Sequence, residues 1–135
     1  MQPVVVYDTN ILFSSILWRS KPNHCIELAR QNIVTGLTCQ EIIEELVEIL
    51  RTKAKFSSSQ LTDTTEELLS FLRLVKITNT LKVVEVDPDD DKVIECAVVG
   101  SATHIITGDR RHLLPLGNYQ GILIITAADF LRQVL

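Results

Sequence analysis

The sequence predicts an α/β protein, a three-layer α/β/α sandwich built around a mostly parallel, Rossmann-like central sheet of about five strands. Two observations predict this class. Short runs rich in β-branched residues alternate with longer stretches in which apolar residues recur at helical spacing. The short runs are apolar on both faces, as parallel strands covered by helices are. Ligands of such folds gather outside the carboxyl ends of the strands, so the residues after each strand are the first site candidates.

The predicted elements follow one another with short connections. Strands are expected at residues 3–7, 33–37, 83–86, 104–107 and 121–125. Helices are expected at 11–17, 22–31, about 38–51, 57–75, 89–99 and 127–134. The third of these helices is expected to open with a T-x-x-E capping box formed by Thr38 and Glu41.

Length and composition favour one globular domain, residues 1–135. The chain is 46% hydrophobic with a mean hydropathy of +0.21, and 135 residues suffice for a genuine core. No segment approaches the roughly 20 apolar residues of a membrane span, so no membrane partner is expected. Asp8 and Asn10 interrupt the first apolar run before it could act as a secretory signal. Three cysteines without a CxxC pair indicate a reduced, cytoplasmic protein.

The charge pattern bears on nucleic-acid partners. A net charge of −4 argues against tight, metal-independent binding to duplex DNA. Clustered active-site carboxylates would account for several of the negative charges. The basic residues fall into local groups of the kind that contact phosphates: Arg51, Lys53 and Lys55; Arg110, Arg111 and His112; Arg19 and Lys21.

Several functional classes are disfavoured by missing motifs. The three histidines lack the spacing of a zinc site and have no cysteine pair beside them. The sequence contains no P-loop, no G-x-G-x-x-G and no G-x-S-x-G. Nucleotide-cofactor enzymes and serine hydrolases are therefore poor interpretations.

Two aspartates directly follow predicted strands. Asp8 ends the first run, and Thr9 or Asn10 could cap the next helix in its place, which leaves the Asp8 carboxylate without a structural need. Asp109 follows the fourth strand, and Thr107 before it could donate a hydrogen bond that holds a carboxylate. We expect Asn10 to orient a carboxylate or to hold the loop.

Two further acids are less sharply placed. Glu45 lies at the edge of the apolar stripe of its helix, which favours it over Glu44 as a residue that leans toward a site. Asp91 competes with Asp89 and Asp90 in the acidic turn. One of the three is expected to cap the helix, and Asp89 is the best placed for that, but spacing alone does not choose the ligand.

Asp8, Glu45, Asp91 and Asp109 together predict a divalent-cation site. Hard cations such as Mg²⁺ take oxygen ligands, usually a few carboxylates with water and substrate phosphates. Carboxylates at the ends of parallel strands supply such ligands at one edge of the sheet. A metal-dependent phosphoryl-transfer enzyme is the leading hypothesis.

The same segments resemble the PIN-domain family, and within it the VapC-like ribonuclease toxins and their relatives (PilT N-terminus-like). The segments that carry the resemblance cover essentially the whole chain and are specific in their order and spacing. They are residues 5–10 (VVYDTN), 44–50 (EELVEIL), 87–94 (DPDDDKVI), 106–109 (ITGD) and 124–131 (IITAADFL). Ala127 stands where relatives often carry Pro after the last strand.

The resemblance implies a PIN-like fold and Mg²⁺- or Mn²⁺-dependent cleavage of single-stranded RNA. It maps the family's four acids onto Asp8, Glu45, Asp91 and Asp109, with Asp90 in reserve for Asp91. It also implies a homodimer, and an antitoxin partner that blocks the site of a toxin.

Two other functional classes stay open. A receiver-like regulatory domain would bind Mg²⁺ and accept phosphate on an aspartate, but receivers pair adjacent acids after the first strand and use a late Lys, and here no Lys follows Lys92. A protein-binding PIN relative with an inactive site is the other, and retention of all four acids counts against it.

Overall fold

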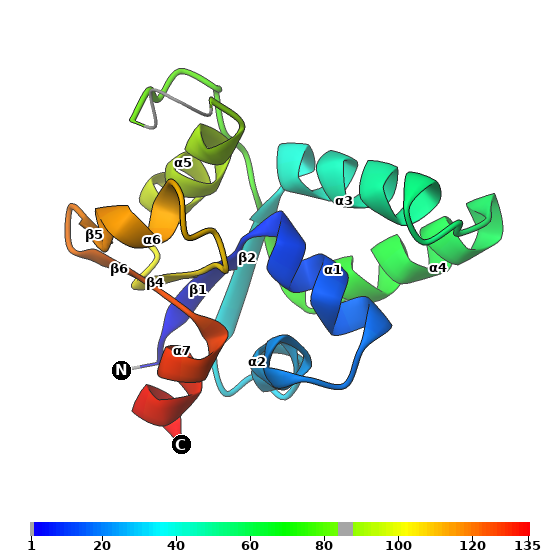
Figure 1. The fold of residues 1–135 in the computed structure, drawn as a ribbon, viewed down its shortest axis with the longest axis horizontal. Coiled ribbons are helices and arrows are strands. Elements are labelled where there is room, and N and C mark those ends of the chain that lie inside the picture. The colour runs from blue at the N-terminus through cyan, green and yellow to red at the C-terminus, as the bar shows by residue number, and fades with distance from the viewer. Residues whose placement is uncertain (1, 84–87) are drawn as a thin grey trace.

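The computed structural model describes residues 2–83 and 88–135 and has a mostly parallel central sheet (Figure 1). The strand order is β3-β2-β1-β4-β6-β5. The strands are β1 (Val4–Tyr7), β2 (Thr35–Cys39), β3 (Leu72–Val75), β4 (His104–Ile106), β5 (Asn118–Tyr119) and β6 (Ile122–Ile125). All neighbours pair in parallel except β5 and β6. The predicted α/β class with a mostly parallel sheet is confirmed, with six strands described in place of about five.

Helices cover both faces of this sheet (Figure 1). They are α1 (Thr9–Leu17), α2 (Lys21–Arg30), α3 (Gln40–Thr52), α4 (Ser58–Leu69), α5 (Asp91–Val99), α6 (Leu113–Leu116) and α7 (Ala127–Val134), with a 3-10 turn η1 (Pro88–Asp90) before α5. Helices α1 to α4 and α7 pack together on one face, and α5 lies against β1, β2 and β4 on the other. Within the described ranges, none of the helices has the length and apolar character of a membrane-crossing segment.

The central strand β1 sits in the middle of the core. Val5, Val6 and Tyr7 are fully buried, and the Tyr7 hydroxyl donates to the carbonyl of Cys25 on α2 at 2.9 Å. Burial raises the pKa of the Tyr7 phenol, so this donor stays protonated. On β2, a Cβ at Gly36 would lie 2.5 Å from a methyl carbon of Leu72 and 3.1 Å from the Cβ of Ala29, so glycine leaves room for these two side chains to pack over the strand.

The structure corrects the predicted element between residues 57 and 75. Helix α4 ends at Leu69, and Leu72–Val75 forms the edge strand β3. Leu72 and Val75 have the spacing of a continuing helix, and only Ser70 and Phe71 separate the two elements, without a Gly or Pro.

The predicted strand at 83–86 falls mainly outside the described residues. Helix α6 and strand β5 were not predicted.

The predicted capping box at Thr38 is also wrong. Thr38 is fully buried within β2, which ends at Cys39, two residues after the end of the predicted strand. Cys39 is the N-cap residue of α3 and makes no side-chain capping bond. A capping box does open α4, where Ser57 and Gln60 each accept a hydrogen bond from the other's backbone N–H.

A carboxylate on α5 fixes the segment that leads from β3 toward the acidic turn. Glu95 is 5% exposed and accepts the backbone N–H groups of Thr78 (2.8 Å), Asn79 (2.9 Å) and Leu81 (3.1 Å). Burial alone would raise the pKa of the Glu95 carboxyl, but these donors outweigh burial and hold it below its ordinary value. The ionised carboxylate therefore stabilises this segment.

We expect Glu95→Gln to lower the free energy of unfolding by about 1–3 kcal/mol at pH 7, because the amide cannot accept all these bonds and its own N–H groups face donors. The stabilisation by Glu95 is fully present above the ordinary Glu pKa of about 4.3 and is lost as the pH falls through the lower folded-state value. Urea unfolding at pH 7 and pH 3 measures the difference, which should shrink at pH 3. The exposed Glu44→Gln is the matched control; equal midpoints for wild type and Glu95→Gln at pH 7 would contradict this role.

Candidate active site

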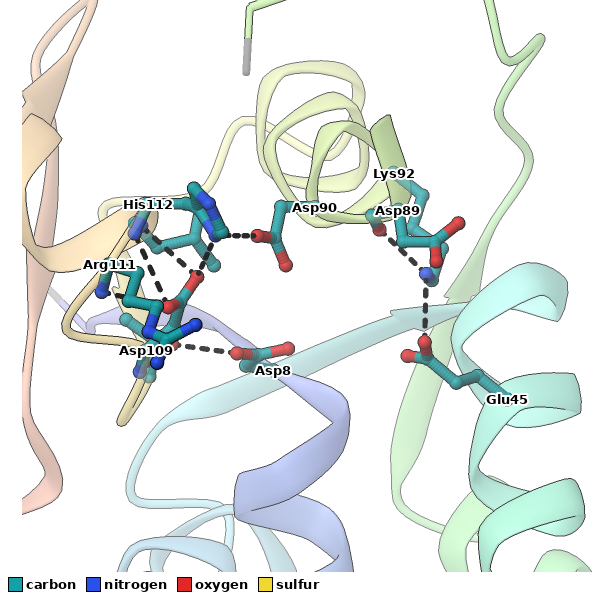
Figure 2. A network of polar contacts seen from close by, with 10 residues as sticks. Asp8, Glu45, Asp89, Asp90, Lys92, Asp109, Arg111 and His112 are labelled. Atoms are coloured by element: carbon teal, nitrogen blue, oxygen red, sulfur yellow. Dashed lines mark hydrogen bonds and ion pairs between the residues drawn. The ribbon is translucent and has the colours of Figure 1, made fainter. Parts of the chain in front are cut away.

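One open cavity of about 490 Å³ lies where β1 and β4 end. Its lining includes Asp8, Glu45, Asp90, Asp109, Arg111 and His112. The register of the sheet explains why the first and last acids meet. Tyr7 pairs with Ile106 in parallel, so Asp8 and Thr107 are the next residues on neighbouring strands, and the Asp8 N–H donates to the carbonyl of Ile106 at 3.0 Å. Carboxylates from four separate parts of the chain line this one space: Asp8, Glu45, Asp89 with Asp90, and Asp109 (Figure 2).

Asp8 is held by two local donors and is 6% exposed. Its Oδ1 accepts the backbone N–H of Thr9 at 2.8 Å, and its Oδ2 accepts the hydroxyl of Thr107 at 2.7 Å. Asp8 is itself the N-cap residue of α1, a duty that we expected Thr9 or Asn10 to perform. Its carboxylate therefore caps a helix and faces the cavity at once.

The surroundings of Asp8 oppose its negative charge. Burial is the main cause that raises the pKa of its carboxyl, and the nearby charges of Glu45 and Asp109 raise it further. The hydrogen bonds from Thr107 and Thr9 offset only part of this. A cation in the cavity would relieve that cost.

Glu45 reaches the cavity from α3. The Thr9 hydroxyl donates a short hydrogen bond to its Oε1, so Thr9 couples the helix that Asp8 caps to the one that carries Glu45. The Glu45 side chain is 36% exposed. Glu44 and Glu48 are exposed, and Glu48 pairs with Arg51. Sequence reasoning missed Thr9 as a site residue, because Thr after a strand-end Asp is equally typical of an ordinary helix start.

Asp109 is held by the backbone of the turn that follows it. Its own N–H donates to the Thr107 hydroxyl oxygen at 3.0 Å, and its carboxylate accepts the N–H groups of Arg111 (3.0 Å), His112 (3.3 Å) and Leu113 (3.3 Å). Burial raises the pKa of the Asp109 carboxyl, but these donors and the Asp90 side chain more than offset it, and the net shift is downward. Asp109 is thus stable as the anion.

Asp90 and His112 complete this side of the cavity. The Nδ1 atom of His112 lies 3.4 Å from Asp90 Oδ2 and 3.5 Å from Asp109 Oδ2. One ligand atom from each of these three residues lies within 4.8 Å of the other two, close enough to surround one metal ion. Figure 2 shows the Asp90 carboxylate turned toward His112 and Asp109.

Asp91, the ligand favoured on sequence, points elsewhere. Its carboxylate is 5% exposed and accepts the backbone N–H of Val83 at 2.9 Å. It lines a neighbouring pocket with Glu95, whereas Asp90, the reserve candidate, lines the cavity of the other acids. The Asp91 carboxylate is directed to the Val83 N–H, whereas Asp89 and Asp90 line the cavity. Asn10 is exposed and lines the cavity as well.

Comparison with known families gives a direct match. The model of the PIN domain matches residues 4–111. This chain belongs to the PIN-domain family. PIN domains are generally nucleases, and PIN nucleases typically use a divalent metal. A comparison with curated proteins found no match.

Two solved structures share the PIN fold with this chain. One is VapBC2 from Rickettsia felis bound to a DNA fragment from its promoter, with a TM-score of 0.60 and 14% identity over 90% of this chain and 96% of that chain. The other is the PIN domain of RRP44 from T. brucei, with a TM-score of 0.54 and 13% identity over 98% of this chain and 81% of that chain. At such identities the likeness shows the fold alone.

The residues around the cavity fit a divalent cation. Asp8, Asp90 and Asp109 supply hard oxygen ligands, and the His112 imidazole adds a nitrogen that Mn²⁺ accepts more readily than Mg²⁺ does. Burial is the main cause that raises the pKa of Asp8, and a bound cation would act in the opposite direction. Such a donor set gains stability when a cation binds.

We expect Asp8→Asn to raise the Tm of the metal-free protein by roughly 3–5 °C at pH 7, because the amide removes a buried charge. The sign follows from the raised pKa of Asp8. The Asp8 carboxyl lowers the stability of wild type relative to the Asn variant as the pH rises above about 3.9 and through the folded-state value. The two Tm values should therefore converge near pH 4. Melting in EDTA at both pH values is the measurement, and an Asn variant that melts below wild type at pH 7 would contradict it.

Proposed function

We propose that this PIN domain is a Mg²⁺- or Mn²⁺-dependent endoribonuclease that cleaves single-stranded RNA. The observation that carries the proposal is that Asp8, Glu45, Asp90 and Asp109, from four separate parts of the chain, line one open cavity. Metal-dependent hydrolysis of a phosphodiester uses such an arrangement, since a cation held there would bind the scissile phosphate and activate water. The cavity is open to solvent, and Arg111 is part of its lining.

In this proposal each residue has a separate role. Asp8, Asp90 and Asp109 hold the cation, with Asp90 in the place for which the sequence favoured Asp91. Thr107 orients two of them, because its hydroxyl donates to Asp8 and accepts from the Asp109 N–H. Arg111 contacts the RNA backbone, where a guanidinium pairs well with phosphate.

The partners follow from the same resemblance. We propose a toxin that an antitoxin protein inhibits, and a homodimer, as in VapC-like relatives. We further place it in the cytoplasm, because Cys25, Cys39 and Cys96 are buried free thiols. Size-exclusion chromatography with light scattering measures the dimer directly.

The test of catalysis compares two adjacent aspartates on mixed single-stranded RNA with Mg²⁺, Mn²⁺ or EDTA. Asp90→Asn should lower metal-dependent cleavage by about 100-fold or more, since it removes a ligand of the cation. Asp91→Asn should keep cleavage within a few-fold of wild type at temperatures well below its Tm. It should instead lower the free energy of unfolding by about 1–3 kcal/mol, because it weakens the bond to the Val83 N–H.

The reverse pattern, with Asp91→Asn inactive and Asp90→Asn active, would return the site to Asp91. Wild type that cleaves no RNA with either metal, although folded and free of any bound inhibitor, would contradict the nuclease itself. Metal-dependent stabilisation without cleavage would then favour a regulatory Mg²⁺-binding domain, and neither activity would favour a protein-binding PIN relative.

A further inference from the structure

Lys92 places a positive charge on one side of the carboxylate cluster. Its Nζ lies 3.3 Å from Glu45 Oε2 and donates to the backbone carbonyl of Asp89 at 2.6 Å. The side chain is only 13% exposed. Figure 2 shows it reaching from the start of α5 toward Glu45 on α3, on the side of the cavity away from His112. The ammonium is thus a fixed part of the site, because two acceptors hold it out of bulk water.

Both oxygens of the Glu45 carboxylate therefore have partners. Oε1 accepts the Thr9 hydroxyl, and Oε2 faces the Lys92 ammonium. Between them these two contacts set the orientation of Glu45 and compensate its charge. Each carboxylate oxygen keeps a second lone pair, but a metal ion bound directly to Glu45 would lie close to the Lys92 ammonium, and two cations at such a distance repel.

The opposite side of the cavity has a different composition. Asp8 lines the cavity with a 6% exposed carboxylate whose partners are one hydroxyl and one backbone N–H. Asp90, Asp109 and His112 offer three ligand atoms within 4.8 Å of one another. One side of the site thus holds the positive charge of Lys92, and the other side has the ligand atoms that could bind a metal ion.

We propose that Lys92 takes the place of a second metal ion, so that this PIN domain binds one divalent cation, at Asp8, Asp90 and Asp109, while Lys92 positions Glu45. This inference rests on the proposed function, because it concerns the cation of the same site. Lys92 acts as a positioning residue: it fixes the Glu45 carboxylate and lowers the negative charge that the entering phosphate meets. The Lys92 ammonium also neutralises part of the charge of the four acids, so that a second metal ion is not needed for this.

The experiment measures Mn²⁺ binding to the full chain by calorimetry, with free Mn²⁺ counted by its electron paramagnetic resonance signal. Wild type should bind one Mn²⁺ per chain. Lys92→Met should bind that ion roughly three- to tenfold more tightly, because a neighbouring positive charge is gone, and should bind a second, weaker ion at the Glu45 side. Lys92→Arg, which restores the charge, should return to one ion. Lys82→Met removes a charge from an exposed position nearby and should bind as wild type does.

A second variant tests the proposal even where Lys92→Met folds poorly. Glu45→Gln should still bind one Mn²⁺, with an affinity lowered less than about tenfold, because Glu45 acts on the ion only through its charge. A loss of 100-fold or more would make Glu45 a direct ligand and would overturn the proposal.

Two further results would overturn it: two Mn²⁺ ions bound per wild-type chain, or a Lys92→Met isotherm equal to that of Lys82→Met. If either result is obtained with a protein that cleaves RNA, the proposed nuclease activity stands and only the proposed role of Lys92 is overturned. Wild type that neither binds Mn²⁺ nor cleaves RNA overturns both proposals.

Discussion

Repulsion between carboxylates at one edge of the sheet is the constraint on which the rest of the site depends. The parallel register of β1 and β4 brings Asp8 beside Thr107 and near Asp109, and packing of α3 and α5 adds Glu45 and Asp90. Three of these acids are compensated in different ways: by one hydroxyl and one backbone N–H at Asp8, by backbone N–H groups at Asp109 and by an ammonium at Glu45. Because Asp8 is also the more deeply buried, its pKa shifts upward whereas that of Asp109 shifts downward. A bound cation would oppose the upward shift at Asp8.

Helix α5 and the turn before it divide their acids between two tasks. Asp91 and Glu95, one helical turn apart, accept backbone N–H groups of the segment between Thr78 and Val83. Asp90 faces the cavity instead. Because the first two hold the segment against α5, the start of the helix is fixed, and so are Asp90 and Lys92.

The fold and the strand ends could be predicted from local pattern, but the choice between neighbouring acids could not. Two strands, Val4–Tyr7 and Ile122–Ile125, are short apolar runs rich in β-branched residues. Such runs favour a buried strand, so the positions of these two strands could be predicted from the sequence. Leu72–Val75 has the apolar spacing of either a helix or an edge strand, and only pairing with β2 decides it. Asp90 and Asp91 have the same local sequence, and what separates them is the Val83 N–H on one and His112 on the other, both set by tertiary packing.

The same reasoning explains why Thr9 and Lys92 could not be identified as site residues from the sequence. Each is defined by contact with Glu45, which lies 36 and 47 residues away from them along the chain. Neither Thr after Asp nor Lys after Asp-Asp-Asp is unusual on a helix start, so the residue types carry no signal of their own. Once α3 packs against α1 and α5, the two side chains hold the two oxygens of one carboxylate. That carboxylate lines the cavity with its charge compensated, and the opposite side of the cavity has the ligands for a cation. The cavity is therefore asymmetric, because its fixed positive charge and its open carboxylates lie on opposite sides of it.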